Sequence, residues 1–189
     1  MNKFTGEQLI KDKLTGRHNY KMMKKYKKVL IFCTIILTLI ICDKITKEIA
    51  KDKLMDKDAV SLLWGTVRFD YVENTGAFLS FGDDLPAWAG VSVFIILPVA
   101  FLLFLFVYSV RKSNETGLFK MISLALIIAG GLGNVVDRIL YNMHVSDFMI
   151  FGFGWLRTGV VNLADIYVTS GVIAFLFTFR KNNTLKPEE

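Results

Sequence analysis

The chain has 189 residues, of which 53% are hydrophobic, and a formal net charge of +6. Its charged residues are gathered into blocks, and the apolar stretches between them include residues 85–110, which contain no Asp, Glu, Lys, Arg or His. A helix needs only about 20 apolar residues to cross a bilayer. This distribution excludes a soluble globular domain, and membrane orientation explains the positive charge better than nucleic-acid binding does.

Four apolar stretches predict four membrane-spanning helices. The first follows Lys28 and has to continue through the polar segment DKITKEIA to be long enough, whereas the second contains Pro98, which can kink a helix. The third is rich in glycine at its far end, and the fourth stops at Arg180. We place the spans at about 29–50, 85–110, 119–137 and 160–179, the outer loops at about 51–84 and 138–159, and the tails at 1–28 and 181–189.

The Lys and Arg residues predict the orientation of these spans, because they mark the cytoplasmic side. They are concentrated in the two tails and in the link between the second and third spans, whereas acidic residues outnumber them in the loop after the first span. Both termini are therefore predicted to be cytoplasmic. A basic tail before an apolar run is also typical of a secretory signal peptide, but no small-residue cleavage site follows and three more spans come later. We interpret the first span as a retained anchor, preceded by a tail that is disordered or forms a surface helix.

The first outer loop contains a predicted strand. In the segment WGTVRFDYV, apolar and polar residues alternate from Val67 to Val72, and the apolar ones are aromatic or β-branched. A small sheet resting on the membrane fits this pattern. The predicted fold class is thus an all-α membrane protein with four transmembrane helices and a small β-rich subdomain outside the cytoplasm.

The cysteines and histidines predict neither a disulfide nor a metal site. Cys33 and Cys42 fall on roughly opposite faces of the first helix, and His18 and His144 are far apart in the sequence. We expect no metal and no cofactor.

Four carboxylates are predicted to collect at the outer face of the membrane, where a buried charge is costly unless it has a partner or a function. They are Asp43, Asp137, Asp147 and Asp165. Asn134 lies three residues before Asp137, and Asn162 lies three residues before Asp165, so each pair shares a helix face. Asp147 falls in the loop between them. Paired carboxylates that share a proton suggest aspartyl hydrolysis.

Two structural alternatives use the same carboxylates without catalysis. They can pair with Arg to lock helices together, or they can line the path of a small channel or transporter. A path would need polar residues in the cytoplasmic halves of the spans, but the span interiors are Leu, Ile, Val and Phe. The polar groups thus cluster at one end of the spans only, and this asymmetry favours a reaction at the membrane surface.

Five short segments, in this order, resemble the lipoprotein signal peptidase (signal peptidase II) family. They are DKITK at 43–47, ENTGAF at 73–78, GGLGNVVDR at 130–138, VSDF at 145–148 and VNLAD at 161–165. The resemblance runs from about residue 29 to 180 and leaves out the amino-terminal tail. Phe78 and Leu79 depart from a family pattern with a second Ala after Ala77, and Val161 stands where Phe is common. These departures bear on the shape of the substrate groove, since neither removes an acid or an amide.

The resemblance implies a set of site residues. Asp147 and Asp165 are the implied catalytic pair. The implied supporting residues are Asp43, Lys47, Asn74, Gly76, Asn134, Asp137, Arg138, Asn162 and Ala164. Among these, Asn74 is expected to cover the substrate, Asn134 and Asn162 to orient the pair, and Asp137 and Arg138 to form a structural polar cluster.

The resemblance also implies the reaction and its setting. The substrate is a prolipoprotein whose cysteine carries a diacylglyceryl group, and the enzyme cleaves on the amino side of that cysteine. The protein is expected to be a monomer in the bacterial inner membrane, in contact with membrane lipids, with its site near the outer leaflet. Aromatic residues of the outer loop are expected either to hold acyl chains or to form an interfacial belt; they are Trp64, Phe69, Phe78, Phe81 and Trp88. An inactive family member that assists assembly is the remaining alternative.

Overall fold

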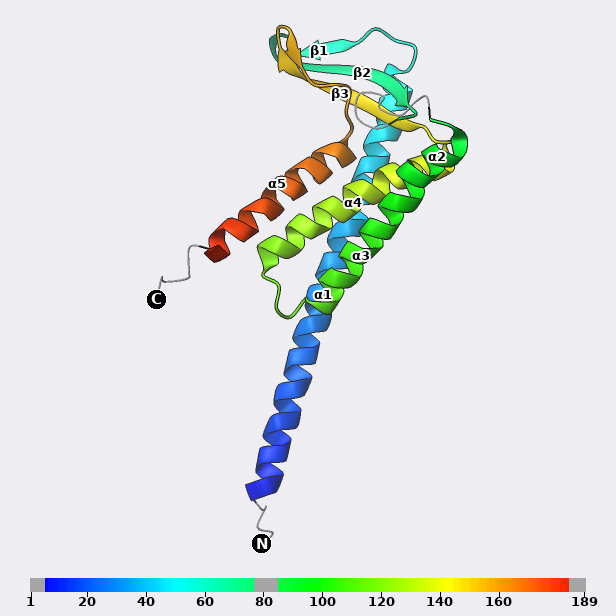
Figure 1. Ribbon diagram of the computed structural model, residues 1–189. Helices are drawn as coiled ribbons and strands as arrows, with labels where there is room; N and C mark the ends of the chain where they lie inside the picture. Colours follow the sequence, from blue (N-terminus) through cyan, green and yellow to red (C-terminus); the bar gives the residue numbers. More distant parts are fainter. Residues whose placement is uncertain (1–5, 77–84, 184–189) are drawn as a thin grey trace.

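The computed structural model describes residues 6–76 and 85–183. Within these residues a bundle of helices carries a small antiparallel sheet across one end (Figure 1). The predicted groove residues Phe78 and Leu79, and the aromatic residue Phe81, lie outside the described residues.

Helix α1 (Gly6–Leu54) contains both the first predicted span and most of the basic tail. Of the two alternatives expected for the tail, the disordered one is wrong from Gly6 onward, because the tail is helical and continuous with the first predicted span. The tail is rich in Lys, a good helix former, and contains no proline, so nothing interrupts the helix before the apolar run. The helix also passes the predicted end near residue 50 and stops at Leu54.

The second predicted span is a helical rod in three parts, α2 (Ala87–Val91), the π-helical segment η3 (Ser92–Ile96) and α3 (Leu97–Arg111). The π turn lies directly before Pro98, the residue expected to disturb this helix. Proline lacks the N–H that an α-helix needs and its ring crowds the preceding turn, and a wider turn accommodates both.

Helix α4 (Leu118–Leu140) is the centre of the bundle and packs against α1, α3 and α5 (Leu163–Asn183). Its contact with α5 depends on Gly130, because a Cβ atom there would overlap the carbonyl oxygen of Ala164. The small residues predicted at this end of the third span therefore allow two helix backbones to approach closely.

Three helical segments are long and apolar enough to cross a membrane: Met22–Leu54, Ala87–Arg111 and Leu118–Leu140. The apolar stretch of α5, Leu163–Thr178, is shorter. The four-span count therefore stays a prediction for α5. Large apolar side chains such as Leu30, Phe104 and Leu176 are exposed on the outer surfaces of these helices, as expected where lipid replaces water.

The sheet is assembled from both predicted outer loops. Its order is β1 (Val60–Leu62), β2 (Val67–Asn74), β3 (Val145–Phe153) and β4 (Leu156–Arg157), all neighbours being antiparallel. The strand predicted from Val67 to Val72 is confirmed as part of β2. The register of β2 on β3 shifts between Phe69 and Val72, after which Val72 faces Asp147. This bulge lies next to a candidate catalytic acid, a common place for such irregularities.

Candidate functional site

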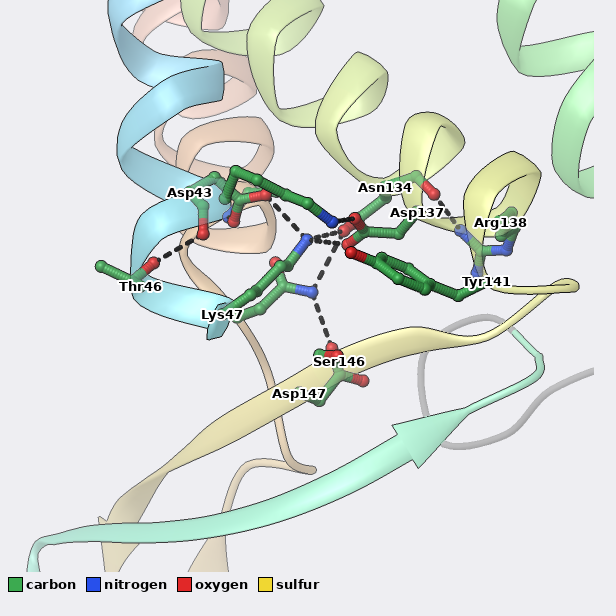
Figure 2. Close-up of polar contacts among 12 residues, drawn as sticks. Asp43, Thr46, Lys47, Asn134, Asp137, Arg138, Tyr141, Ser146 and Asp147 are labelled. Atoms are coloured by element: carbon green, nitrogen blue, oxygen red, sulfur yellow. Dashed lines mark hydrogen bonds and ion pairs between the residues drawn. The ribbon is translucent and has the colours of Figure 1, made fainter. Parts of the chain in front are cut away.

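The four carboxylates predicted to collect do meet, at the end of the bundle that carries the sheet. Asp43 comes from α1, Asp137 from the last turns of α4, Asp147 from β3 and Asp165 from the first turn of α5. Figure 2 shows Asp43 and Asp137 on neighbouring helices, facing the strand that bears Asp147. The sequence placed Asp147 in a loop, whereas it lies in a strand and is almost fully buried.

Asn162 joins the two candidate catalytic acids. Its side-chain amide donates to Asp147 Oδ1 over 2.6 Å, and its backbone N–H donates to Asp165 Oδ2 over 3.0 Å. The backbone N–H of Asp165 in turn donates to Asn162 Oδ1 over 3.0 Å. This reciprocal pair is a capping box, with Asn162 before the first residue of α5 and Asp165 in its first turn. Asn162 and Asp165, three residues apart in the sequence, therefore begin helix α5, and the same hydrogen bonds position the Asp165 carboxylate.

Asn134 holds the other oxygen of Asp165. Its Nδ2 donates to Asp165 Oδ1 over 2.8 Å, while its Oδ1 accepts from Lys47 Nζ at 3.0 Å and from Asn162 Nδ2 at 3.1 Å. A carboxamide can only accept through its oxygen and donate through its nitrogen. The Lys47 ammonium group therefore fixes the orientation of the Asn134 amide. In this orientation the amide nitrogen faces Asp165 and donates to it.

The end of β2 covers Asp147 from the side of the sheet. Asn74 donates from Nδ2 to Asp147 Oδ2 over 3.0 Å, and the N–H of Gly76 donates to Asn74 Oδ1 over 3.0 Å. Arg138 donates from Nη2 to the Gly76 carbonyl oxygen over 2.5 Å, and its guanidinium group lies 5.2 Å from the centre of the Phe94 ring. Arg138 thereby ties the segment after β2 to helix α4.

A buried ion cluster lies behind the two acids, centred on Lys47. The Lys47 ammonium is 2.7 Å from Asp43 Oδ2 and 2.7 Å from Asp137 Oδ2, and all three side chains are almost fully buried. Lys44 adds a second ammonium group 2.9 Å from Asp137 Oδ1. Charges removed from water in this way are stable only when paired. The cluster thus fixes α1 against α4.

Asp137 and Arg138 were expected to form one structural polar cluster, but they do not pair with each other. The Asp137 carboxylate pairs with Lys44 and Lys47, and Arg138 binds the Gly76 and Asn134 carbonyl oxygens. Successive residues on a helix do not face each other, so adjacency was a poor guide. The expectation that Asp137 belongs to a structural polar cluster still describes its surroundings.

Asp43 connects this cluster to the start of α5. Its Oδ1 accepts from the Ala164 N–H over 2.9 Å, one of the N–H groups left unpaired at the start of a helix. Gly133 leaves room for this contact, because a Cβ atom there would lie 2.9 Å from Asp43 Oδ2. Ala164 therefore contributes its backbone to the site, and its small side chain is fully buried.

Burial raises the pKa of Asp147 to about 6, and the negative charge of Asp165 acts in the same direction. Hydrogen bonds from Asn74 and Asn162 and the more distant charge of Lys47 oppose the rise. Near neutral pH, the arrangement therefore lets Asp147 hold or release a proton beside a second carboxylate, which is what acid–base chemistry on an amide requires.

A cavity of about 450 Å³ opens beside the two acids. Its polar part is formed by amide, guanidinium and carboxylate groups, and its apolar part reaches toward the middle of the bundle. The lining residues used below are Phe94, Pro98, Gly131, Arg138, Asp147 and Asp165. Val161, one of the departures from the family pattern, is buried and bonds to Met149 through both backbone groups; the cavity is lined by its neighbours Val160 and Asn162.

No metal-binding group is found in residues 6–76 and 85–183, where no three His, Cys, Asp or Glu side chains are placed to hold an ion. Cys33 and Cys42 are both free thiols. The Lys47 ammonium occupies the space between Asp43 and Asp137 that a cation would need.

Sequence reasoning did not identify two contributors to this site. Lys44 supports Asp137, and its ammonium also lies 4.0 Å from the centre of the Tyr141 ring. Phe94 supports Arg138 and lines the cavity. The π turn that contains Phe94 has no recognised sequence signal beyond the nearby Pro98.

The fold and the site together define a helical membrane protein with two carboxylates, both hydrogen-bonded to Asn162, at one end of its bundle. Residues 35–180 match the family described as Signal peptidase (SPase) II. The chain belongs to this family, and the resemblance noted in the sequence is confirmed.

Individual relatives agree with this assignment. The chain is 34% identical over 158 residues to the lipoprotein signal peptidase of Borreliella afzelii, covering 81% of this chain and 89% of that protein. It is 37% identical over 123 residues to the lipoprotein signal peptidase of Borrelia duttonii, covering 61% and 71%. A bacterial membrane enzyme solved at 2.3 Å by the in meso method superposes with a TM-score of 0.71 and 28% identity, covering 84% of this chain and 93% of that one.

Proposed function

We propose that the protein is a membrane-embedded aspartyl endopeptidase that removes signal peptides from diacylglyceryl-modified prolipoproteins. Cleavage would occur on the amino side of the lipidated cysteine. Family membership supports the substrate class. The observation that carries the mechanism is the bridge made by Asn162, which binds Asp147 and Asp165 at the same time.

In the proposed reaction, the two acids share one proton. Asp147, whose pKa is raised to about 6, holds the proton and donates it toward the scissile carbonyl oxygen. Asp165 is ionised and takes a proton from a water molecule as its oxygen attacks the carbonyl carbon. The product of this step is a tetrahedral intermediate with two hydroxyl groups.

The intermediate then collapses with proton transfers in the opposite direction. Asp165 gives its proton to the amide nitrogen, the carbon–nitrogen bond breaks, and a hydroxyl proton returns to Asp147. The signal peptide leaves with a new carboxyl group, and the lipidated cysteine becomes a free amino terminus. Asn74, Asn134 and Asn162 hold the carboxylates in place through these steps, so that little reorganisation is needed in the transition state.

The shape of the cavity supports a substrate that lies partly in the bilayer. Asp147, Asp165 and Arg138 surround its polar part, whereas Phe94 and Pro98 belong to the apolar rod of the second predicted span. We propose a monomer in the bacterial inner membrane with both termini in the cytoplasm. The dyad then lies near the outer leaflet, where the scissile bond of a membrane-anchored precursor is expected.

A transporter or channel is the main alternative function. It would need buried polar groups along the bundle, but the buried ionisable and amide side chains of the described residues belong to the cluster at one end. The buried hydroxyl groups elsewhere, such as Ser109 and Ser123, bond to carbonyl groups of their own helices. This distribution favours a reaction at one membrane face.

The test is cleavage of a diacylglyceryl-modified prolipoprotein by the purified protein in detergent, with the products separated on a gel and the new amino terminus identified by mass spectrometry. The precursor with Cys→Ser at the cleavage site, which carries no lipid, should be cleaved very poorly, since acyl contacts would supply binding energy that orients the scissile bond. Asp52→Asn, at an exposed acid, serves as the matched control for variants of the dyad. Equal rates on both precursors would refute the lipid-dependent substrate, and no cleavage of either would favour the inactive assembly factor.

A further inference from the structure

The end of the sheet far from the dyad presents five exposed apolar side chains on two adjacent connections. Leu63 and Trp64 lie between β1 and β2, whereas Phe153, Trp155 and Leu156 lie at and around the turn between β3 and β4. We call these five residues the sheet tip. The two connections are neighbours, because Val67 pairs with Phe151 and the Gly152 N–H donates to the Thr66 carbonyl oxygen over 2.9 Å.

The turn between β1 and β2 is closed by hydrogen bonds to the Leu63 carbonyl oxygen from the Thr66 N–H over 3.1 Å and the Thr66 hydroxyl over 2.7 Å, and it uses left-handed residues, as hairpin turns do. Leu63 and Trp64 have φ values of 50° and 52°, in the left-handed region that non-glycine residues rarely adopt. Such conformations persist only where the surroundings favour them, and they cluster at functional sites. Trp64 is 99% exposed and Trp155 is 93% exposed, so neither indole packs against the described part of the protein. The turn instead holds a large aromatic side chain away from the fold.

The charge of the tip suits a lipid interface. Residues 62–66 and 151–158 contain no acidic residue, and their one charged residue is Arg157. The opposite end of the same sheet is polar and carries Glu73, Asn74 and Asp147. Tryptophan is enriched where the hydrocarbon core of a bilayer meets the headgroups, since its ring is apolar and its N–H is a donor.

The position of the tip also suits a lipid interface. Figure 1 shows the sheet lying across the ends of the helices, with the β1–β2 and β3–β4 connections at the upper left, on the end of the sheet away from α2 and α3. This end of the sheet lies away from the core of the bundle, so it is free to meet the lipid that surrounds the helices.

We propose that the sheet tip inserts into the headgroup–acyl boundary of the leaflet on the sheet side and is a second membrane anchor beside the helices. The tip and Asp147 share strand β3, and Phe153 follows Asp147 along it at roughly 20 Å. Insertion would therefore fix the height of Asp147 relative to the bilayer surface. That last consequence rests on the proposed function, whereas insertion itself does not.

The experiment uses the three tryptophans of the chain as reporters. One variant keeps Trp64 alone (Trp88→Phe with Trp155→Phe), and a second keeps Trp155 alone (Trp64→Phe with Trp88→Phe). These side chains are exposed, so the substitutions leave the core unchanged. Each protein is reconstituted at high lipid-to-protein ratio in vesicles of phosphatidylcholine and phosphatidylglycerol, with nitroxide labels either near the headgroup or at the chain end.

Insertion predicts that both tryptophans lose more fluorescence to labels near the headgroup than to labels at the chain end, and that aqueous iodide quenches them poorly. Strong quenching by iodide with no effect of the labelled lipids would place the tip in water and overturn the proposal. Protection from iodide with no effect of the labelled lipids would show that protein covers the tip, such as a second copy of the chain, and would overturn it equally. The readout needs no substrate, so a failure of the proposed peptidase reaction would not be confused with a failure of insertion.

Discussion

Asp147 and Asp137 are both buried carboxylates, and their surroundings predict opposite effects when each is replaced by Asn. Asp147 has a pKa raised from 3.8 to about 6, mainly by burial, so its ionised form is costly in the folded protein. A shift of this size corresponds to about 3 kcal/mol. The folded state keeps the proton up to about pH 6 whereas the unfolded chain loses it near 3.8, so the stability that this proton contributes is lost as the pH rises through that window.

The Asp147→Asn variant never bears this charge. Its amide can accept only one of the two hydrogen bonds that Asn74 and Asn162 donate to Asp147, and the lost bond costs about 1 kcal/mol. We therefore expect the variant to be more stable than the wild type near neutral pH and above, by about 2 kcal/mol. It should have no turnover, because Asn can neither share nor donate the proton.

The Asp137→Asn variant leaves Lys44 and Lys47 without their shared carboxylate. Removing one partner of a buried ion pair typically costs about 3–5 kcal/mol, so this variant should lose stability. Because Asp137 lies behind the dyad and outside the cavity lining, the variant should retain activity per folded molecule.

The assay is thermal unfolding in detergent at about pH 5 and about pH 8, combined with cleavage measured on the purified, folded fraction. In cells, lost abundance would look the same as lost catalysis. If the Asp147→Asn variant is less stable than the wild type at the higher pH, burial does not make the ionised form of Asp147 costly, and the reasoning is refuted. An inactive but folded Asp137→Asn beside an active Asp147→Asn would show that the dyad is assigned to the wrong acid.

Four further predictions follow from the site and the sequence. The value of kcat/KM should fall as the pH rises through about 6, because Asp147 loses its proton there, and a rise instead would contradict its role as the acid. Lys47→Met should lower the unfolding temperature strongly, since it leaves Asp43 and Asp137 buried without their common partner; an unchanged temperature would show that the cluster contributes little. Cleavage should continue in EDTA, and full loss reversed by zinc would mean a different reaction class. Reporter fusions after Lys112 and after Arg180 should behave as cytoplasmic and one near Asp58 as external, whereas an external carboxyl terminus would exclude the four-span topology.

The helices could be predicted because an uninterrupted apolar run that is long enough to cross a bilayer has few other interpretations. For the tail of α1, disorder and a helix both stayed open, since a lysine-rich stretch has no apolar face that marks it as helical; its continuity with the first span was not predicted. Strand β3 was missed because VSDFMIFGF does not alternate clearly, and its partner β2 is distant in the chain. Local spacing identified the Asn162–Asp165 pair, whereas the contacts of Asp137 with Lys44 and Lys47 cross from α4 to α1 and depend on how the helices pack.

The capping box at the start of α5 has a consequence for the dynamics of the site. The two hydrogen bonds between Asn162 and Asp165 that begin the helix are also those that set the position of one acid relative to the other. Fraying of this single turn would release Asp165 from Asn162 without any wider unfolding, so under the proposed function the local opening equilibrium of the first turn of α5 would limit the fraction of molecules that can react. Hydrogen exchange at the amide of Asp165 would report the opening of its bond to Asn162, and a ligand that bridges both carboxylates would slow this exchange.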